Sequence, residues 1–216
     1  MDYIKLLSAF FIIILVYVLF SYLKLKKNIF LKYLKKKQNV CLIIAHPDDE
    51  IMFFFPTLKL LFDKKEKNEI FLFSLSNGNL YGLGKIREKE LFHVWSYLGG
   101  ERRNCKVLNN INIQDGWDYW DEENISNILN DYCSKHNINT ILTFDNYGIS
   151  GHPNHISIFN SVRLLSKIKE IDIFILNSTN IIHKYMGFIS FPFLLHKKFL
   201  ISFFNPLLLL RVNAFI

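Results

Sequence analysis

The chain has 216 residues, which is room for one catalytic domain and an appendage but not for two full domains. Half of the residues are hydrophobic and the mean hydropathy is +0.16, values at the upper edge for a globular protein. The formal net charge is +7, but seven lysines between residues 24 and 37 account for it. A nucleic-acid-binding protein is therefore disfavoured, since such a protein spreads basic residues over its folded surface.

An uncharged apolar run at residues 6–23 predicts one transmembrane helix. Its eighteen residues would rise roughly 27 Å, close to the hydrocarbon thickness of a bilayer. The lysine run that follows predicts a luminal N-terminus and a cytoplasmic body. A cleaved signal peptide is the alternative, but the run is long and no small-x-small cleavage site precedes the lysines. Three widely spaced cysteines (Cys41, Cys105 and Cys133) fit reduced thiols in the cytoplasm.

Strands and helices alternate along the rest of the sequence. Short apolar runs predict five strands, at residues 39–44, 69–75, 106–108, 139–144 and 171–176. Helical patterns predict four helices, at residues 51–63, 85–98, 122–136 and 153–168. Asp48 and Asp49 are placed to cap the first helix, and Pro56 is placed to bend or restart it. The alternation predicts an α/β fold with a Rossmann-like, mainly parallel sheet flanked by helices.

Two histidine clusters follow predicted strands and should meet at the edge where the strands end. His46 and Asp49 come directly after the first strand, and His152 and His155 open the last helix. A catalytic zinc commonly has three protein ligands and an open position. His46, Asp49 and His155 can supply the ligands while His152 faces the open position, and Asp48 is available as a base. Taken singly, each feature has a plainer interpretation, such as helix capping by the two aspartates.

Four stretches of the sequence also carry a family resemblance. They are AHPDDE at 45–50, SNGNLYGLGKIR at 76–87, QDG at 114–116 and LTFDNYGISGHPNH at 142–155. Together they resemble the N-acetylglucosaminyl-phosphatidylinositol de-N-acetylase (PIG-L) family of LmbE-like zinc deacetylases, over about residues 39–185. The resemblance implies that His46, Asp49 and His155 bind Zn²⁺, that Asp48 is the general base, and that a protonated His152 steadies the oxyanion.

Weaker roles follow for two more residues. The resemblance suggests that Arg87 and Asp145 contact the substrate or support the ligands. The alternative for Arg87 is a surface helix residue paired with Glu88 or Glu90. The other histidines lack acidic or histidine neighbours at a strand end, and we expect His93 and His136 to be ordinary helix residues.

The function implied by the resemblance is hydrolysis of N-acetylglucosaminyl-phosphatidylinositol to glucosaminyl-phosphatidylinositol and acetate, the second step of GPI-anchor biosynthesis. Such an enzyme would sit in the endoplasmic reticulum membrane, with no obligate protein partner indicated. We expect an anchor and basic segment at 1–38, a deacetylase domain at 39–185, and an apolar tail at 186–216 of uncertain role. Three alternatives stay open: a deacetylase of a soluble N-acetylglucosamine conjugate, a non-catalytic membrane subunit with the same fold, and a basic peripheral lipid binder.

Overall fold

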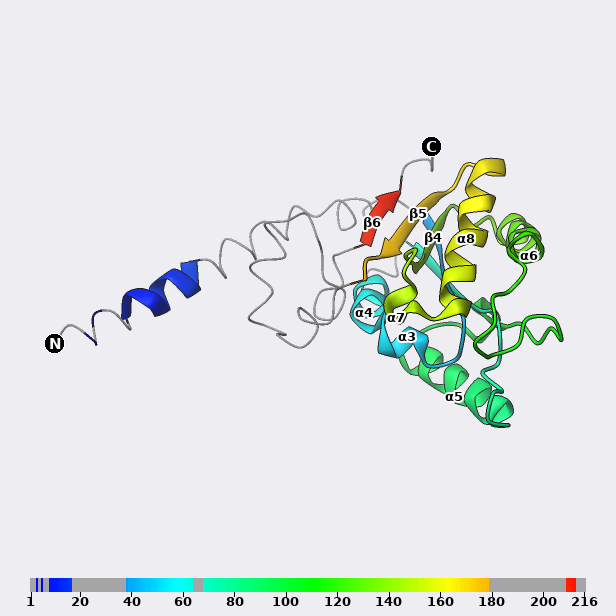
Figure 1. The fold of residues 1–216 in the computed structure, drawn as a ribbon, viewed down its shortest axis with the longest axis horizontal. Coiled ribbons are helices and arrows are strands. Elements are labelled where there is room, and N and C mark those ends of the chain that lie inside the picture. The colour runs from blue at the N-terminus through cyan, green and yellow to red at the C-terminus, as the bar shows by residue number, and fades with distance from the viewer. Residues whose placement is uncertain are drawn as a thin grey trace.

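A computed structural model describes residues 3, 5, 8–16, 38–63 and 68–178, and the backbone of residues 209–212. Its centre is a six-stranded sheet in the order β3-β2-β1-β4-β5-β6 (Figure 1). The first five strands are parallel, and β6 runs antiparallel to β5. The strands are β1 (Gln38–Ile44), β2 (Asn68–Ser74), β3 (Cys105–Val107), β4 (Thr140–Phe144), β5 (Asp172–Leu176) and β6 (Leu209–Val212). The predicted parallel sheet is confirmed, and β6 adds a strand from the tail that the sequence pattern did not reveal.

Helices cover both faces of the sheet. They are α3 (Asp49–Met52), α4 (Phe55–Phe62), α5 (Gly84–Tyr97), α6 (Glu122–Lys135), α7 (Gly148–Gly151) and α8 (Pro153–Ile168), with a 3-10 turn, η1, at Arg102–Asn104. α4 and α5 share one face, where the rings of Phe62 and Trp95 meet at 5.2 Å. α6 and α8 pack together on the other face (Figure 1). The crossovers from β1 to β2 and on to β3 run toward one edge of the sheet, and those from β3 to β4 and on to β5 run toward the other. Because each crossover is right-handed, the two sets of helices lie on opposite faces.

Burial on both faces explains the apolar sequence of the central strand. The residues of β1 from Val40 to Ile44 are fully buried, as are all five residues of its neighbour β4. A strand covered on both faces reads as a continuous hydrophobic run rather than as an alternating one. The three cysteines are free and buried within the same core.

The predicted helix at 51–63 is two helices, because the helix is interrupted between Met52 and Phe55, just before Pro56. Proline lacks an N–H donor and clashes with the preceding turn, so it is tolerated in the first turn of a helix, where it stands in α4. The interruption lets the Phe54 side chain turn inward against Phe144, with ring centroids 5.4 Å apart. A second difference is α7, a short helix within the predicted loop at 145–151.

The predicted transmembrane span lies largely outside the described residues. Within it, residues 8–16 are helical. Among the residues that the structure describes, no helix is both long enough and apolar enough to cross a membrane. The lysine run at 24–37 also lies outside the described residues.

The sheet has its switch point between β1 and β4. The chain continues from β1 toward β2 and from β4 toward β5, so the connections diverge on either side of this pair. The register pairs Leu42 with Leu142, which brings the carboxyl ends of both strands to the same height. Ligands in open α/β sheets bind in the crevice at such a point. The residues that follow β1 and β4 are those of the two predicted histidine clusters.

Candidate metal centre

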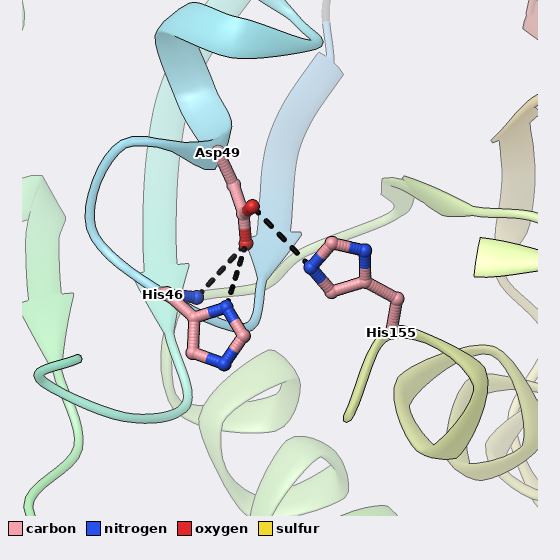
Figure 2. Close-up of side chains that lie close together, drawn as sticks. All are labelled: His46, Asp49 and His155. Atoms are coloured by element: carbon pink, nitrogen blue, oxygen red, sulfur yellow. Dashed lines mark hydrogen bonds and ion pairs between the residues drawn. The ribbon is translucent and has the colours of Figure 1, made fainter. Parts of the chain in front are cut away.

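Three side chains converge at the switch point: His46, Asp49 and His155 (Figure 2). His46 Nδ1 lies 3.7 Å from Asp49 Oδ2, and His155 Nε2 lies 3.3 Å from Asp49 Oδ1. Each of the three residues is buried and offers a ligand atom within 4.8 Å of the others. The first two come from the turn after β1, and His155 comes from the first turn of α8. The structure therefore brings together the three residues that the sequence predicted as ligands.

A second polar atom of each candidate ligand is held by the protein. Asp49 Oδ2 accepts the backbone N–H groups of Ala45 (3.1 Å) and His46 (2.9 Å). The His155 Nδ1 group donates to the carbonyl oxygen of Gly148 at 3.1 Å, which places the free lone pair on Nε2. Such outer contacts orient metal-binding imidazoles and carboxylates in known sites.

His46 is oriented in the same way by two oxygens. Its Nε2 lies 2.9 Å from Asn154 Oδ1 and 3.0 Å from Asp115 Oδ1. Asn154 presents oxygen here because its Nδ2 donates to the Asp118 carbonyl at 2.8 Å. Nε2 therefore carries the hydrogen, and Nδ1, on the Asp49 side, keeps its lone pair.

The three side chains fit a divalent cation. His155 Nε2 is buried without a hydrogen bond, since its approach to Asp49 Oδ1 has the distance but not the geometry of one. An orphaned acceptor of this kind is rare in a folded protein unless something else binds it. Two imidazole nitrogens and one carboxylate oxygen are also a common ligand set for Zn²⁺.

Charges in the centre favour an ionised Asp49. Burial by itself would raise the pKa of this carboxyl group, but His155, His46 and the backbone N–H of His46 outweigh it and lower the pKa. The His46 imidazole is shifted the other way. Burial lowers its pKa, while the hydrogen bond to Asp115 and the charges of Asp49 and Asp115 raise the pKa above its usual value overall.

Asp48 does not cap α3 as the sequence suggested. It occupies the N-cap position, but its side chain makes no capping hydrogen bond, and the Asp49 carboxylate turns back onto the strand end. The backbone at Asp48 has a φ of 113°, a left-handed conformation that costs a non-glycine residue free energy. The helix-capping interpretation of the two aspartates is therefore wrong. The strained turn instead directs the two carboxylates to different partners.

Arg87 binds the turn that carries Asp48. Its Nη2 donates to Asp48 Oδ2 and to the Pro47 carbonyl, both at 2.7 Å. Its Nη1 donates to the Gly78 carbonyl at 2.9 Å and to Asp115 Oδ2 at 3.3 Å. The alternative of a surface pairing with Glu88 or Glu90 is wrong, because the guanidinium points into the site.

Asp145 lies outside the cluster and braces the loop beside it. Its Oδ1 accepts the N–H groups of Tyr147 (3.1 Å) and Gly148 (3.0 Å). The hydroxyl and backbone N–H of Ser178, just beyond β5, also donate to the Asp145 carboxylate. These bonds support the segment whose Gly148 carbonyl orients His155, which favours the supporting role over substrate contact.

His152 borders the centre, and its environment favours the neutral imidazole. Its ring is 5.1 Å from that of His46 and 4.9 Å from that of His155, and it stacks on the exposed Trp117 at 4.9 Å. Burial, followed by His155 and His46, lowers the pKa of His152 to about 4. A pKa in this range favours a neutral His152 over the protonated one that the resemblance implied. Because its Nδ1 accepts the Asn154 N–H at 3.3 Å, Nε2 carries the hydrogen.

Two contributing residues received no role in the sequence analysis. Asp115 joins His46 to Arg87, and Asn154, fully buried, joins His46 to the loop before α6. The signals were present, since Asp115 is the acid of the QDG stretch and Asn154 stands between the two late histidines. Local patterns did not show that either side chain reaches His46. Of the remaining histidines, His93 and His136 lie on helices away from the centre, and His183 and His196 lie outside the described residues.

The segment that carries the three candidate ligands is similar in sequence to known proteins. Residues 41–165 match the family model described as "PIG-L: GlcNAc-PI de-N-acetylase". A probable N-acetylglucosaminyl-phosphatidylinositol de-N-acetylase of Schizosaccharomyces pombe is 36% identical over 155 residues, 71% of this chain and 62% of that protein. One from Dictyostelium discoideum is 36% identical over 186 residues, covering 72% of this chain and 71% of that protein. The Bos taurus enzyme is 35% identical over 156 residues, 70% of this chain and 61% of that protein. The chain thus spans less than two thirds of the yeast and bovine relatives.

Solved structures support the fold alone. An N,N'-diacetylchitobiose deacetylase from Pyrococcus horikoshii has a TM-score of 0.55 at 17% identity, over 76% of this chain and 71% of that one. A deacetylase–teicoplanin complex has a TM-score of 0.53 at 10% identity, over 65% and 70%. A 4-carboxy-2-hydroxymuconate hydratase has a TM-score of 0.50 at 10% identity, over 65% of each chain. The last shows that this fold by itself does not decide the reaction.

Gly148→Ala should weaken metal binding through His155. A Cβ at Gly148 would lie 2.8 Å from the Cβ of His155, and the backbone φ there is +60°. Gly151→Ala is the matched control, because its φ is +78° but no atom lies within 4 Å of the added Cβ. Both variants should lose stability, but only Gly148→Ala should lower Zn²⁺ affinity, by roughly tenfold as for other outer contacts of metal ligands. Competition with a chromogenic chelator measures this, and equal affinities would contradict it.

The strain at Asp48 can be measured with two substitutions. Asp48→Gly and Asp48→Ala both remove the ion pair with Arg87, so the difference between them reports the backbone. With φ at 113°, we expect the glycine variant to be more stable by about 1 kcal/mol. Denaturant unfolding of the detergent-solubilised chain gives the comparison. An alanine variant of equal or greater stability would mean that no strain is stored at this turn.

Proposed function

This chain belongs to the PIG-L family, and we propose that it removes the acetyl group from N-acetylglucosamine linked to phosphatidylinositol, a step of GPI-anchor biosynthesis. Water would cleave the amide, so that acetate is released and the sugar keeps a free amine. The observation that supports this best is the convergence of His46, Asp49 and His155 at the switch point, inside the matched segment.

These three side chains are the ligands that we propose for Zn²⁺. When bound, the ion supplies a Lewis acid that polarises the acetamide carbonyl and makes the attacking water more acidic. The outer contacts from Gly148, Asn154 and the turn after β1 keep the ligand atoms aimed at one point.

Asp48 is the base in this proposal and takes a proton from the attacking water. Burial and the charge of Asp49 raise the pKa of Asp48, while Arg87 and His46 oppose the shift, and the pKa remains above its usual value. A base with a raised pKa accepts a proton more readily and can pass it to the departing nitrogen. Arg87, at 2.7 Å, fixes the direction of the carboxylate.

His152 acts in the proposal as a neutral donor. Its Nε2–H group would bond to the carbonyl oxygen as negative charge develops there, which lowers the barrier because the donor is oriented beforehand. The stacking of both Trp117 and His155 on His152 restricts rotation of its ring.

The decisive experiment uses membranes that contain the full chain and N-acetylglucosaminyl-phosphatidylinositol, and follows release of acetate with and without a chelator. Asp48→Asn should keep the metal and lose about 10²–10⁴-fold in turnover, the usual contribution of a positioned base. His155→Ala should lose the metal itself. Asp63→Asn, an exposed acid paired with Lys59 on α4, is the control and should be unaffected.

Two outcomes would change the assignment. Near-normal turnover by Asp48→Asn would remove its role as base. Faster deacetylation of a soluble N-acetylglucosamine conjugate than of the lipid-linked sugar would replace the substrate while leaving the chemistry in place.

The setting that we propose is the endoplasmic reticulum membrane, with a single span at residues 6–23 and the catalytic domain facing the cytoplasm. The eighteen apolar residues and the seven lysines that follow them support this orientation. On sealed vesicles with the cytoplasmic face outward, protease should digest the domain without detergent. The sequence has two N-glycosylation sequons, Asn124-Ile125-Ser126 and Asn177-Ser178-Thr179, and both should carry no glycan. A protected or glycosylated domain would reverse the topology.

A further inference from the structure

Exposed apolar side chains gather at one edge of the domain. Within residues 38–63 and 68–178, thirteen large hydrophobic side chains are exposed. Eleven of them lie in the loops and first helical turns that directly follow the carboxyl ends of strands. Only Tyr97 and Ile168, at the ends of α5 and α8, lie at the opposite edge. Scattered exposed hydrophobics are normal, but a one-sided collection marks an interaction surface.

The collection lies at the same edge of the sheet as the candidate metal centre. Met52 (60% exposed) is on α3, and Tyr81 (83%) and Ile86 (54%) come from the segment between β2 and α5, which also supplies Arg87. Trp117 (71% exposed) stacks on His152, and Tyr147 (57%) precedes α7. Four different segments thus present apolar or aromatic side chains at the edge of the sheet that carries the candidate centre.

The chemistry of these side chains suits the interface of a lipid bilayer. Tyrosine and tryptophan, which combine an apolar ring with a polar group, are enriched at the level of the lipid headgroups. Residues 76–86 carry a single charge, that of Lys85, and no acid. A lysine beside exposed apolar groups can keep its ammonium group in water while its stem lies along an apolar surface.

We propose that this edge, defined by the exposed apolar residues after the carboxyl ends of β1 to β4, docks on the interfacial region of a phospholipid bilayer. The candidate centre then faces the lipid surface from which the sugar projects. The inference rests on the proposed function, in which the substrate is lipid-linked, and adds a second membrane contact to the predicted N-terminal span.

The length of the connecting chain permits this orientation. β1 begins at the amino edge of the sheet, opposite the docking edge, and its seven residues span roughly 23 Å. The fourteen residues from 24 to 37 separate the predicted span from β1 and can extend to about 48 Å. The predicted span and the docking edge can therefore lie against the same membrane.

Tryptophan fluorescence can report the contact in the full chain. Of the three tryptophans, Trp95 and Trp120 are buried and Trp117 is exposed. In vesicles of phosphatidylcholine and phosphatidylinositol with brominated acyl chains, we expect emission to be lower than in unbrominated vesicles. Trp117→Phe should abolish that difference, and wild-type emission insensitive to bromine would overturn the proposal.

Matched pairs of substitutions test the edge itself. Tyr81→Glu with Ile86→Glu alters the docking edge, and Tyr97→Glu with Ile168→Glu alters two similarly exposed residues at the opposite edge. The first pair should reduce bromine quenching and lower turnover of the lipid-linked sugar by about tenfold, since the charged side chains would no longer be buried in the bilayer interface. Turnover of a soluble N-acetylglucosamine conjugate should not change, and the second pair should affect neither measurement.

Other results separate the two proposals. Equal effects of both pairs would overturn docking, as would self-association of the chain that the first pair abolishes, because a second copy would then cover the edge. Bromine quenching without acetate release from either substrate would support docking and overturn the proposed function.

Discussion

The carboxylate of Asp49 connects the two halves of the sheet at the candidate centre. One oxygen accepts backbone N–H groups at the end of β1, and the other faces His155 on α8. The chain diverges at this point toward β2 on one side and β5 on the other, and the contact between His46 and Asn154 also joins the two halves there. The two backbone N–H groups offset part of the cost of burying this carboxylate, and a divalent cation held by Asp49 and the two imidazoles would offset more of it.

Negative charge accumulates around that contact. Asp49 and Asp115 are largely buried, Asp48 is exposed, and Arg87 reaches two of these three carboxylates. Burial also raises the pKa of the neighbouring Glu50 to about 7. One guanidinium does not balance this group of acids. A divalent cation at His46, Asp49 and His155 would supply the missing positive charge, in keeping with the unpaired nitrogen of His155.

Fold and chemistry carry separate information in this protein. Structural neighbours at 10–17% identity include deacetylases and a hydratase, so the sheet and its helices are a scaffold for more than one reaction. The assignment to one family comes from residues 41–165, and the chemistry comes from side chains on loops after β1, β2, β3 and β4. Those same loops carry the exposed apolar groups, so the surface that would meet a membrane and the site that would use its lipid are built from the same segments.

The sequence by itself determined the elements whose signals are local. The apolar run of β1, the alternation of strands with helices, and the placement of His46, Asp49 and His155 just beyond strand ends all follow from residue order, because parallel strands end at a common edge. The break at Pro56 was also visible as a possibility, since proline restricts the chain wherever it stands.

Tertiary structure alone decided the direction of side chains and the pairing of distant segments. Asp48 turns away from its helix because the backbone adopts φ of 113°, Arg87 binds the turn after β1 rather than its helix neighbours, and Asp115 and Asn154 meet at His46. The lowered pKa of His152 comes first from burial and then from two other imidazoles, whose rings lie within 5.1 Å of its own. Strand β6 pairs with β5 by backbone hydrogen bonds, which leave little pattern in the side chains. These features arise between residues far apart in the chain, and a local pattern carries no information on the distance between them.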